Sequence, residues 1–292
     1  MNIASLSENK KIEKRLAITP EITKKYLDLG FNLFLPNNYG NHLGFDDNDY
    51  KSLGVNFLNN EKDIIDKSDI IIQLGIPEDQ KLSLLKENQT LVGSLDFFSN
   101  KEKLISLKSK KINCFSLEML PRITRAQSMD ILSSQANLAG YKAVIEAFQI
   151  YERAIPMMMT AAGTIPAAKV LVVGAGVAGL QAIATAKRMG AIVFATDVRA
   201  ASKEQVESLG GKFLMVDGME NLETEGGYAK EASDDFKKKQ EDLLSETLKK
   251  IDLVICTALI PGKEAPKIIK EDMFKNFKKG SIIYDLAAVQ GG

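Results

Sequence analysis

The stretch KVLVVGAGVAGLQAIATAKRMGAIVFATDVR, residues 169–199, decides the fold of the second half of the chain. Its opening run KVLVV predicts a buried strand, and AIVFATD at 191–197 predicts a second one. The residues between 177 and 189 have helical spacing, and Gly190 follows them where a helix commonly ends. The stretch therefore predicts a strand, a helix and a parallel strand, the repeating unit of a sheet covered by helices.

Three glycines mark the turn between the first strand and the helix. Gly174, Gly176 and Gly179 form a GxGxxG pattern, which is a weak signal alone but here follows a strand and opens a helix. In such a turn the first glycine permits the tight bend, the second lets a pyrophosphate approach the backbone, and the third allows helix and strand to pack closely. The helix N-terminus adds free N–H groups and a positive dipole end. The turn predicts a dinucleotide site, and the alternative is a glycine-rich turn that binds no ligand.

The second strand ends in Asp197, which can accept hydrogen bonds from both hydroxyls of an adenosine ribose. A 2′-phosphate would face this carboxylate, so we predict NAD(H) rather than NADP(H) as the cofactor. Arg199 is evidence in the other direction, because an arginine near this position can hold a 2′-phosphate. The predicted cofactor-binding residues are Gly174, Ala175, Gly176, Val177, Gly179, Asp197, Val198, Arg199 and Tyr228.

Tyr228 stands in GGYAKE, within the acidic run 216–230, which has neither helical nor strand periodicity. The run predicts a mobile loop, and the tyrosine could fold over a bound nucleotide as a lid. A plain surface tyrosine is the alternative.

The rest of the chain alternates apolar runs with helical patterns. In the first half the predicted strands, buried on both faces, are 32–36, 69–75, 90–95 and 112–116. In the second half the further strands are 211–215, 252–259 and 280–287, and the further helices are 201–209, 230–249 and 266–276. The predicted architecture is α/β, with two Rossmann-like, doubly wound parallel-sheet domains, 1–130 and 131–292, joined by a long helix over about 130–152.

Composition argues against several classes of function. Lysine plus arginine and aspartate plus glutamate are both 38, so the net charge is zero and gives no indication of a nucleic-acid partner. A single histidine, His42, argues against a metal site, and Cys114 and Cys256 are predicted as buried strand residues in a reducing compartment. No window has the roughly 18 apolar residues of a membrane span, and the N-terminus lacks a signal-peptide core. We therefore expect a cytoplasmic protein without direct membrane insertion.

The segment PRITRAQSMDILSSQANLAGYKAV, residues 121–144, is rich in hydrogen-bonding groups. Residues 122–136 include two arginines, two glutamines, one carboxylate and four hydroxyls, but no His, Cys or Lys. Together with the sequences at 156–191, 196–213, 226–231 and 257–263, this segment closely resembles the alpha subunit of the proton-translocating NAD(P) transhydrogenase family, in its extramembrane NAD(H)-binding component. The resemblance is dense from about residue 117 to 287 and looser before that.

The resemblance implies a two-domain component, usually a homodimer, that is peripheral at the inner membrane through its partner subunits. It also implies a membrane-spanning proton channel and a separate NADP(H)-binding component, with hydride passing between the two nicotinamides in a Re/Si-specific, proton-coupled reaction. In the family a polar loop holds the nicotinamide and ribose of NADH. Its positions match Arg122, Gln127, Asp130 and Ser133 here, while the family's acid and loop tyrosine match Asp197 and Tyr228.

Hydride transfer between two nicotinamides moves no proton to or from a side chain, so it needs orientation of the rings and exclusion of water rather than a general acid or base. By resemblance, Arg122 and Asp130 would fix the carboxamide and ribose, Ser133 would add a hydroxyl, and Gln127 would reach toward the partner's nucleotide. The alternative is that these groups cap the long helix, with Ser128 or Asp130 as the N-cap residue.

Alanine dehydrogenase resembles the same family and is the rival hypothesis. Arg15, in EKRLAITPE, matches its substrate-carboxylate arginine. That enzyme also needs a lysine and a histidine, but this chain has Gln73 and Gly75 near the first position and Asp96 at the second. Oxidative deamination requires a proton acceptor, and none is placed for it. A third hypothesis is a non-catalytic, NAD-sensing regulatory protein.

The sequence stops at SIIYDLAAVQGG, 281–292, directly after a predicted strand. In the resembling family the chain continues and returns to the first domain, so the first domain is expected to lack its C-terminal return segment and to expose apolar surface. Val289 stands where the family commonly has an acid.

Overall fold

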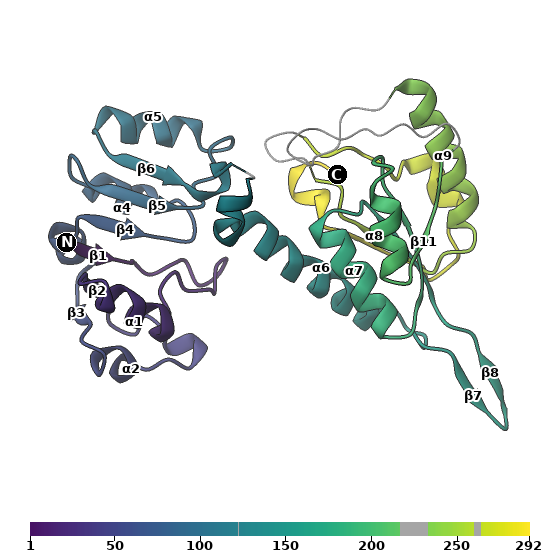
Figure 1. Ribbon diagram of the computed structural model, residues 1–292, viewed down its shortest axis with the longest axis horizontal. Coiled ribbons are helices and arrows are strands. Elements are labelled where there is room, and N and C mark those ends of the chain that lie inside the picture. The colour runs from purple at the N-terminus through teal and green to yellow at the C-terminus, as the bar shows by residue number, and fades with distance from the viewer. Residues whose placement is uncertain (122, 217–232, 260–263) are drawn as a thin grey trace. The chain divides into compact units, whose positions relative to one another are not determined.

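The computed structural model describes residues 1–121, 123–216, 233–259 and 264–292 (Figure 1). The chain divides into two compact units, Met1–Ile131, here called unit 1, and Leu132–Gly292, called unit 2. Each unit contains a parallel β-sheet, and the predicted α/β class with Rossmann-like parallel sheets is confirmed.

The sheet of unit 1 has the strand order β3-β2-β1-β4-β5-β6, and all of its pairs are parallel. Its strands are β1 (Asn2–Ala4), β2 (Asn32–Pro36), β3 (Asn56–Leu58), β4 (Ile70–Ile72), β5 (Thr90–Gly93) and β6 (Asn113–Ser116). Its helices are α1 (Pro20–Asp28), α2 (Asp47–Lys51), α3 (Glu61–Lys67), α4 (Asp79–Leu84) and α5 (Lys101–Ser109). Short 3₁₀ helices cover η1 (Asn41–Leu43), η2 (Leu117–Met119) and η3 (Thr124–Met129). The strands β1 and β3 were not among the predicted elements.

Helix starts in unit 1 follow local chemistry. Thr19 caps α1 by accepting a hydrogen bond from the backbone N–H of Ile22, and Pro20 occupies the first turn, where its missing N–H costs nothing. Adjacent strand residues then point to opposite faces of the sheet. Ala4 packs with residues of α3 to α5, whereas Ile3 packs with Tyr39 and Tyr50 near α2. Both faces are therefore covered, as a parallel sheet requires.

Strand β6 differs from the prediction that its residues are buried. It lies at the end of the strand order, and Cys114 is exposed rather than buried, while the Phe115 side chain is 60% exposed. An apolar run identifies a strand but not its position in the sheet, and an edge strand loses cover on one side. Cys256 is buried as predicted, because its strand β12 lies inside the sheet of unit 2.

The sheet of unit 2 has the order β11-β10-β9-β12-β13, again with parallel pairs only. Its strands are β9 (Lys169–Val173), β10 (Ile192–Thr196), β11 (Lys212–Phe213), β12 (Leu253–Cys256) and β13 (Ile282–Asp285). The helices that follow or precede them are α6 (Ile131–Ile150), α7 (Val177–Arg188), α8 (Ser202–Ser208), α9 (Asp234–Leu248), η4 (Glu271–Asn276) and η5 (Ala287–Gln290).

Two predicted elements of unit 2 are shorter than expected. The predicted strand 211–215 keeps only the two residues of β11, and the predicted helix 266–276 is only the 3₁₀ helix η4. Pro266 opens that stretch, and a proline restricts the residue before it to extended backbone. The core nevertheless forms on both faces, because Val170 and Val172 pack with residues of α6 and α7, while Leu171 and Val173 pack with residues of α9.

Helices α6 and α7 approach each other at Gly140. A Cβ built on Gly140 would lie 2.0 Å from the carbonyl oxygen of Ala178, so no residue with a side chain fits there without movement. Nearby, the Nδ2 of Asn137 donates to Oε1 of Gln181 at 3.3 Å. A glycine in the middle of a helix ordinarily lowers helix stability by about 1 kcal/mol relative to alanine. Here the close backbone contact explains its presence.

A β-hairpin extends from unit 2 away from its sheet (Figure 1). Its strands β7 (Met158–Thr160) and β8 (Gly163–Ile165) are antiparallel, and all six residues are exposed. The exposed fractions of Met158, Met159 and Ile165 are 47%, 73% and 51%.

Among the described residues, no helix combines the length and the apolar character that a membrane crossing needs. Within the same residues, no group of three or more His, Cys, Asp or Glu side chains is arranged to hold a metal ion.

Candidate functional site

The glycine-rich turn lies between β9 and α7, at the carboxyl end of the sheet of unit 2. Gly174 has a φ of +95°, in the left-handed region that favours glycine, and its N–H donates to the carbonyl oxygen of Thr196 at 2.8 Å. On one side of β9 the sheet continues to β10 and on the other to β12. The turn therefore lies where the strand order reverses, the place where ligands bind in open α/β sheets.

Gly179 brings the first turn of α7 against this bend. A Cβ at this position would lie 1.9 Å from the carbonyl oxygen of Gly174 and 3.0 Å from Oγ1 of Thr257. Because backbone atoms cannot yield that far, only glycine fits at residue 179 without a shift of helix or turn. This is the close packing that the third glycine of the pattern was predicted to provide.

Gly176 has the opposite surroundings. It is the N-cap residue of α7, it supplies no capping side chain, and no heavy atom lies within 4 Å of the position that its Cβ would occupy. The first N–H groups of a helix have no partner within the helix, and here they face open space with the positive end of the helix dipole. These features fit the diphosphate of a dinucleotide. Ala175 is buried beside the turn, and Val177 is the first residue of α7.

Asp197 directly follows β10 and is 8% exposed. Its Oδ2 accepts from the backbone N–H of Ala175 at 2.7 Å, so the acid is tied to the glycine turn. Its Oδ1 accepts from the backbone N–H of Arg199 at 2.8 Å. The guanidinium of Arg199 adds two bonds, from Nε to Oδ1 at 2.9 Å and from Nη2 to Oδ2 at 3.0 Å. Val198 lies between the two charged residues and is half-buried.

Thr257 is a supporting residue that sequence reasoning missed. It follows β12, and its hydroxyl donates to the carbonyl oxygen of Gly174 at 2.9 Å, while its backbone N–H donates to that of Val173 at 2.8 Å. The hydroxyl thereby fixes the turn from the neighbouring strand. A signal was available, because the residue after each strand of a parallel sheet lies at the same edge as the turn.

The predicted nicotinamide-positioning residues are distributed over the boundary between the units. Gln127 lies in η3 and is exposed, and Asp130 follows η3 and is half-buried, both in unit 1. Ser133 lies in the first turn of α6, in unit 2, and is also half-buried. Arg122 and Tyr228 fall outside the described residues, as does nearly all of the predicted loop 216–230. The roles of all five residues remain predictions.

Arg15, the residue that matches the substrate arginine of alanine dehydrogenase, is paired with Glu13. Its Nε donates to Oε1 of Glu13 at 2.9 Å, and its Nη2 donates to Oε2 at 2.6 Å. The same contact lowers the pKa of the Glu13 carboxyl, with the hydrogen bond from Arg15 as the largest cause. A carboxylate of this chain therefore already takes the two-pronged contact that a substrate carboxylate would need.

Gln73, where that enzyme needs a lysine, is a structural residue. It follows β4, is 3% exposed, and its Oε1 accepts from the backbone N–H of Leu6 at 2.7 Å and from the hydroxyl of Ser5 at 3.0 Å. Its Nε2 donates to Oε1 of Glu8 at 3.2 Å. The amide ties the ends of β1 and β4 together. Burial is the largest influence on Glu8 and raises the pKa of its carboxyl.

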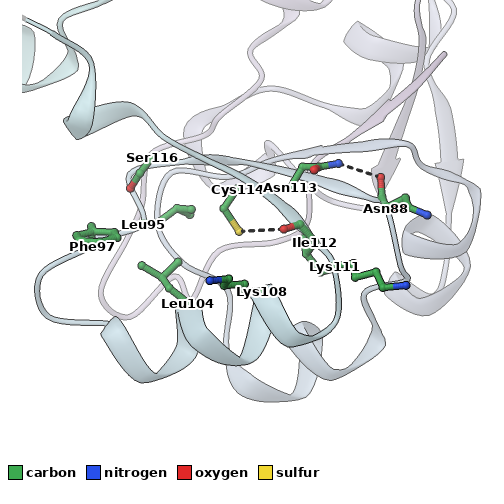
Figure 2. A pocket seen from close by; sticks show the side chains of 10 residues that line it. All are labelled: Asn88, Leu95, Phe97, Leu104, Lys108, Lys111, Ile112, Asn113, Cys114 and Ser116. Carbon is green, nitrogen blue, oxygen red and sulfur yellow. Dashed lines mark hydrogen bonds between the residues drawn. The ribbon is translucent and has the colours of Figure 1, made fainter.

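A groove of about 430 Å³ lies on unit 1 beside β6 (Figure 2). Its lining residues are Asn88, Leu95, Phe97, Leu104, Lys108, Lys111, Ile112, Asn113, Cys114 and Ser116. Partial burial raises the pKa of the Cys114 thiol. No residue predicted to bind a cofactor or a nicotinamide lines this groove, so it is separate from the dinucleotide turn.

Comparison with known proteins identifies relatives along the whole chain. The family model described as alanine dehydrogenase/PNT, N-terminal domain, matches residues 5–139, and the corresponding C-terminal domain matches residues 143–292. The first of the separate alpha-subunit chains of the NAD(P) transhydrogenase from Rhodospirillum rubrum is 48% identical and is aligned over 100% of this chain and 78% of its own length.

A solved structure of transhydrogenase from Sinorhizobium meliloti has a TM-score of 0.87 and 41% identity, with 100% of this chain and 80% of that one covered. An alanine dehydrogenase from Methanococcus maripaludis is more distant, at 27% identity over 100% of this chain and 73% of its own length.

Proposed function

The chain belongs to the alanine dehydrogenase/PNT family, and from its far higher identity to transhydrogenase alpha subunits than to alanine dehydrogenases we propose its function. It is the NAD(H)-binding component of a proton-translocating, Re/Si-specific NAD(P) transhydrogenase. It acts only with partner subunits, one that binds NADP(H) and one that spans the inner membrane, and it is a cytoplasmic protein held peripherally at that membrane. The observation that carries the proposal is the 48% identity over the whole chain to a transhydrogenase alpha subunit.

The turn between β9 and α7 supports binding of a dinucleotide, and Asp197 supports NAD(H). The carboxylate stands at the end of β10, where the adenosine ribose would lie against the turn. A ribose with free hydroxyls can donate to it, whereas a 2′-phosphate would bring a second negative charge to a carboxylate that is only 8% exposed.

The nicotinamide would be held by side chains without acid–base roles. A bound NADH supplies a hydride to NADP⁺ on the partner component, and the work of this chain is to orient the ring and keep water away. We assign Arg122 and Asp130 to the carboxamide and ribose, Ser133 to an added hydroxyl contact, and Gln127 to alignment with the partner's nucleotide. Tyr228 is proposed to cover the bound nucleotide.

The alanine dehydrogenase hypothesis is weakened by unit 1. Arg15 is paired with Glu13, and the amide of Gln73 is engaged in holding β1 to β4. Neither residue offers the combination of a carboxylate receptor and a proton acceptor that oxidative deamination requires.

A direct test separates the two activities. The purified chain is expected to bind NADH, seen as a change in nucleotide fluorescence, and to show no NADH oxidation with pyruvate and ammonia. Mixed with the NADP(H)-binding component of a transhydrogenase, it should transfer hydride between the two nucleotides, followed with an acetylpyridine analogue of NAD⁺. Pyruvate-dependent oxidation by the isolated chain would overturn the proposal in favour of alanine dehydrogenase.

We further propose that the chain is a homodimer and that the β7–β8 hairpin contributes to its interface. A two-stranded hairpin is marginally stable alone, and this one exposes Met158, Met159 and Ile165. Apolar side chains on a projecting hairpin are typical of a surface that another chain covers.

Replacing Met158 and Met159 together by serine is therefore expected to shift the chain from dimer to monomer in sedimentation velocity at micromolar concentration. Met215→Ser is the matched control, because Met215 is 52% exposed but lies outside the hairpin, and it should leave the dimer intact. A wild-type monomer, or a double variant that remains fully dimeric, would contradict the assignment of this interface.

A further inference from the structure

The carboxylate of Asp197 uses its whole hydrogen-bonding capacity within the chain. Two donors are backbone N–H groups, of Ala175 and Arg199, and two come from the guanidinium of Arg199. A carboxylate offers about four lone-pair positions, so the four N–H groups occupy them. Ribose hydroxyls can bind this acid only if a donor leaves.

The guanidinium is the donor that can leave. The N–H of Ala175 is fixed by the turn, and the N–H of Arg199 is fixed by the backbone that follows β10. The side chain of Arg199, by contrast, has several rotatable bonds, and its exposed fraction of 15% exceeds the 7% of the Asp197 side chain. Once displaced, the guanidinium remains tethered two residues from the acid, beside the ribose that displaced it.

We propose that Arg199 is a latent 2′-phosphate receptor that Asp197 holds in a neutralising pair, and that this pair, rather than the acid alone, makes the site selective for NAD(H). The inference rests on the proposed binding of NAD(H). A guanidinium matches a phosphate in the same forked geometry in which it now holds the carboxylate.

The pair discriminates through what each nucleotide must break. Ribose hydroxyls are neutral donors, so they replace the two guanidinium N–H groups on a carboxylate that stays hydrogen-bonded. A 2′-phosphate donates nothing to Asp197. It can reach Arg199 only by separating a largely buried ion pair, and it then leaves the carboxylate without its cation and adds a like charge beside it.

Substitution of the acid should expose the receptor. Asp197→Asn keeps an oxygen for the N–H of Ala175, but a neutral amide cannot hold the guanidinium by two charge-assisted bonds. The freed Arg199 is then available to a phosphate, so this one-atom change should increase affinity for a 2′-phosphate, and only while Arg199 is present.

The experiment titrates adenosine 5′-monophosphate and adenosine 2′,5′-bisphosphate by calorimetry, since these fragments report the ribose site without the nicotinamide. The proteins are the full chain as wild type, Asp197→Asn, Arg199→Gln and the double variant. Arg188→Gln is the matched control, because Arg188 is an exposed arginine in the last turn of α7.

Asp197→Asn should bind the bisphosphate about tenfold or more tightly than wild type, the scale of a hydrogen bond to a charged group. The double variant should lose this gain, and Arg188→Gln should match wild type for both ligands. Arg199→Gln alone should weaken the bisphosphate while leaving the monophosphate as tight or tighter, a result that does not depend on the Asp197 variant being folded.

A gain in the double variant equal to that in Asp197→Asn would overturn the role of Arg199, as would an Arg199→Gln chain that binds the bisphosphate like wild type. These outcomes leave the proposed function intact. If wild type binds neither NADH nor the monophosphate, the proposed NAD(H) function itself fails.

Discussion

Gly179→Ala is expected to destabilise unit 2 severely. Overpacking a core ordinarily costs about 1–3 kcal/mol, and a Cβ placed 1.9 Å from the carbonyl oxygen of Gly174 belongs at or beyond the upper end of that range. For a unit of this size, about 3 kcal/mol lowers the melting temperature by about 6–12 °C. Differential scanning calorimetry of the variant and wild type measures this directly.

Gly176→Ala separates stability from binding. The same methyl group at residue 176 meets no atom within 4 Å and the backbone φ is −76°, so the melting temperature should change little. The methyl would instead occupy the space predicted for the pyrophosphate, and NADH affinity should fall. Equal melting temperatures for the two variants would contradict the close contact at Gly179, and unchanged NADH affinity in Gly176→Ala would contradict the position assigned to the phosphates.

Gln127→Asn is expected to slow hydride transfer by about 100-fold while NADH binds almost as before. The shortened side chain keeps the amide but withdraws it by one methylene, and a misplacement of about 1 Å can reduce a reaction rate by about this factor. Gln127 is exposed in η3, so the substitution removes no core contact. Stopped-flow transfer with the NADP(H)-binding component, together with an NADH titration, gives the two quantities separately.

Ser128→Ala is the neighbouring control for the Gln127 variant. Ser128 is exposed in the same 3₁₀ helix, and its loss should leave both transfer and binding unchanged. Arg122→Ala, by contrast, should reduce both, because its guanidinium is assigned to NADH. Loss of NADH affinity in Gln127→Asn, with Arg122→Ala harmless, would reverse the two roles.

Local pattern predicted the elements of unit 2 that a few adjacent residues determine. The strand at 169–173, the turn at Gly174 and the helix from Val177 depend on apolar periodicity and glycine placement, and all three are present. The long helix predicted over 130–152 is also present, as Ile131–Ile150. These elements are where propensity and periodicity agree with the tertiary structure.

The misses depend on contacts between residues distant in sequence. The exposure of Cys114 follows from the place of β6 at the end of the strand order, which no local pattern encodes. The close approach at Gly140 requires knowledge that Ala178 lies opposite. In the candidate site, Asp197 was predicted from its place after a strand, but its pairing with Arg199 and the support from Thr257 became visible only with the fold.

The crossing at Gly140 also gives α6 the mechanics of a lever. The helix touches the backbone of Ala178 in the first turn of α7, next to the turn predicted for the pyrophosphate, so this contact can serve as a fulcrum. Ser133 lies seven residues away on α6, which at 1.5 Å per residue is an arm of about 10 Å. A rotation of about 5° at the fulcrum then displaces Ser133 by about 1 Å. Occupancy of the phosphate turn is thereby coupled mechanically to the alignment of the nicotinamide, on the length scale to which hydride transfer is sensitive.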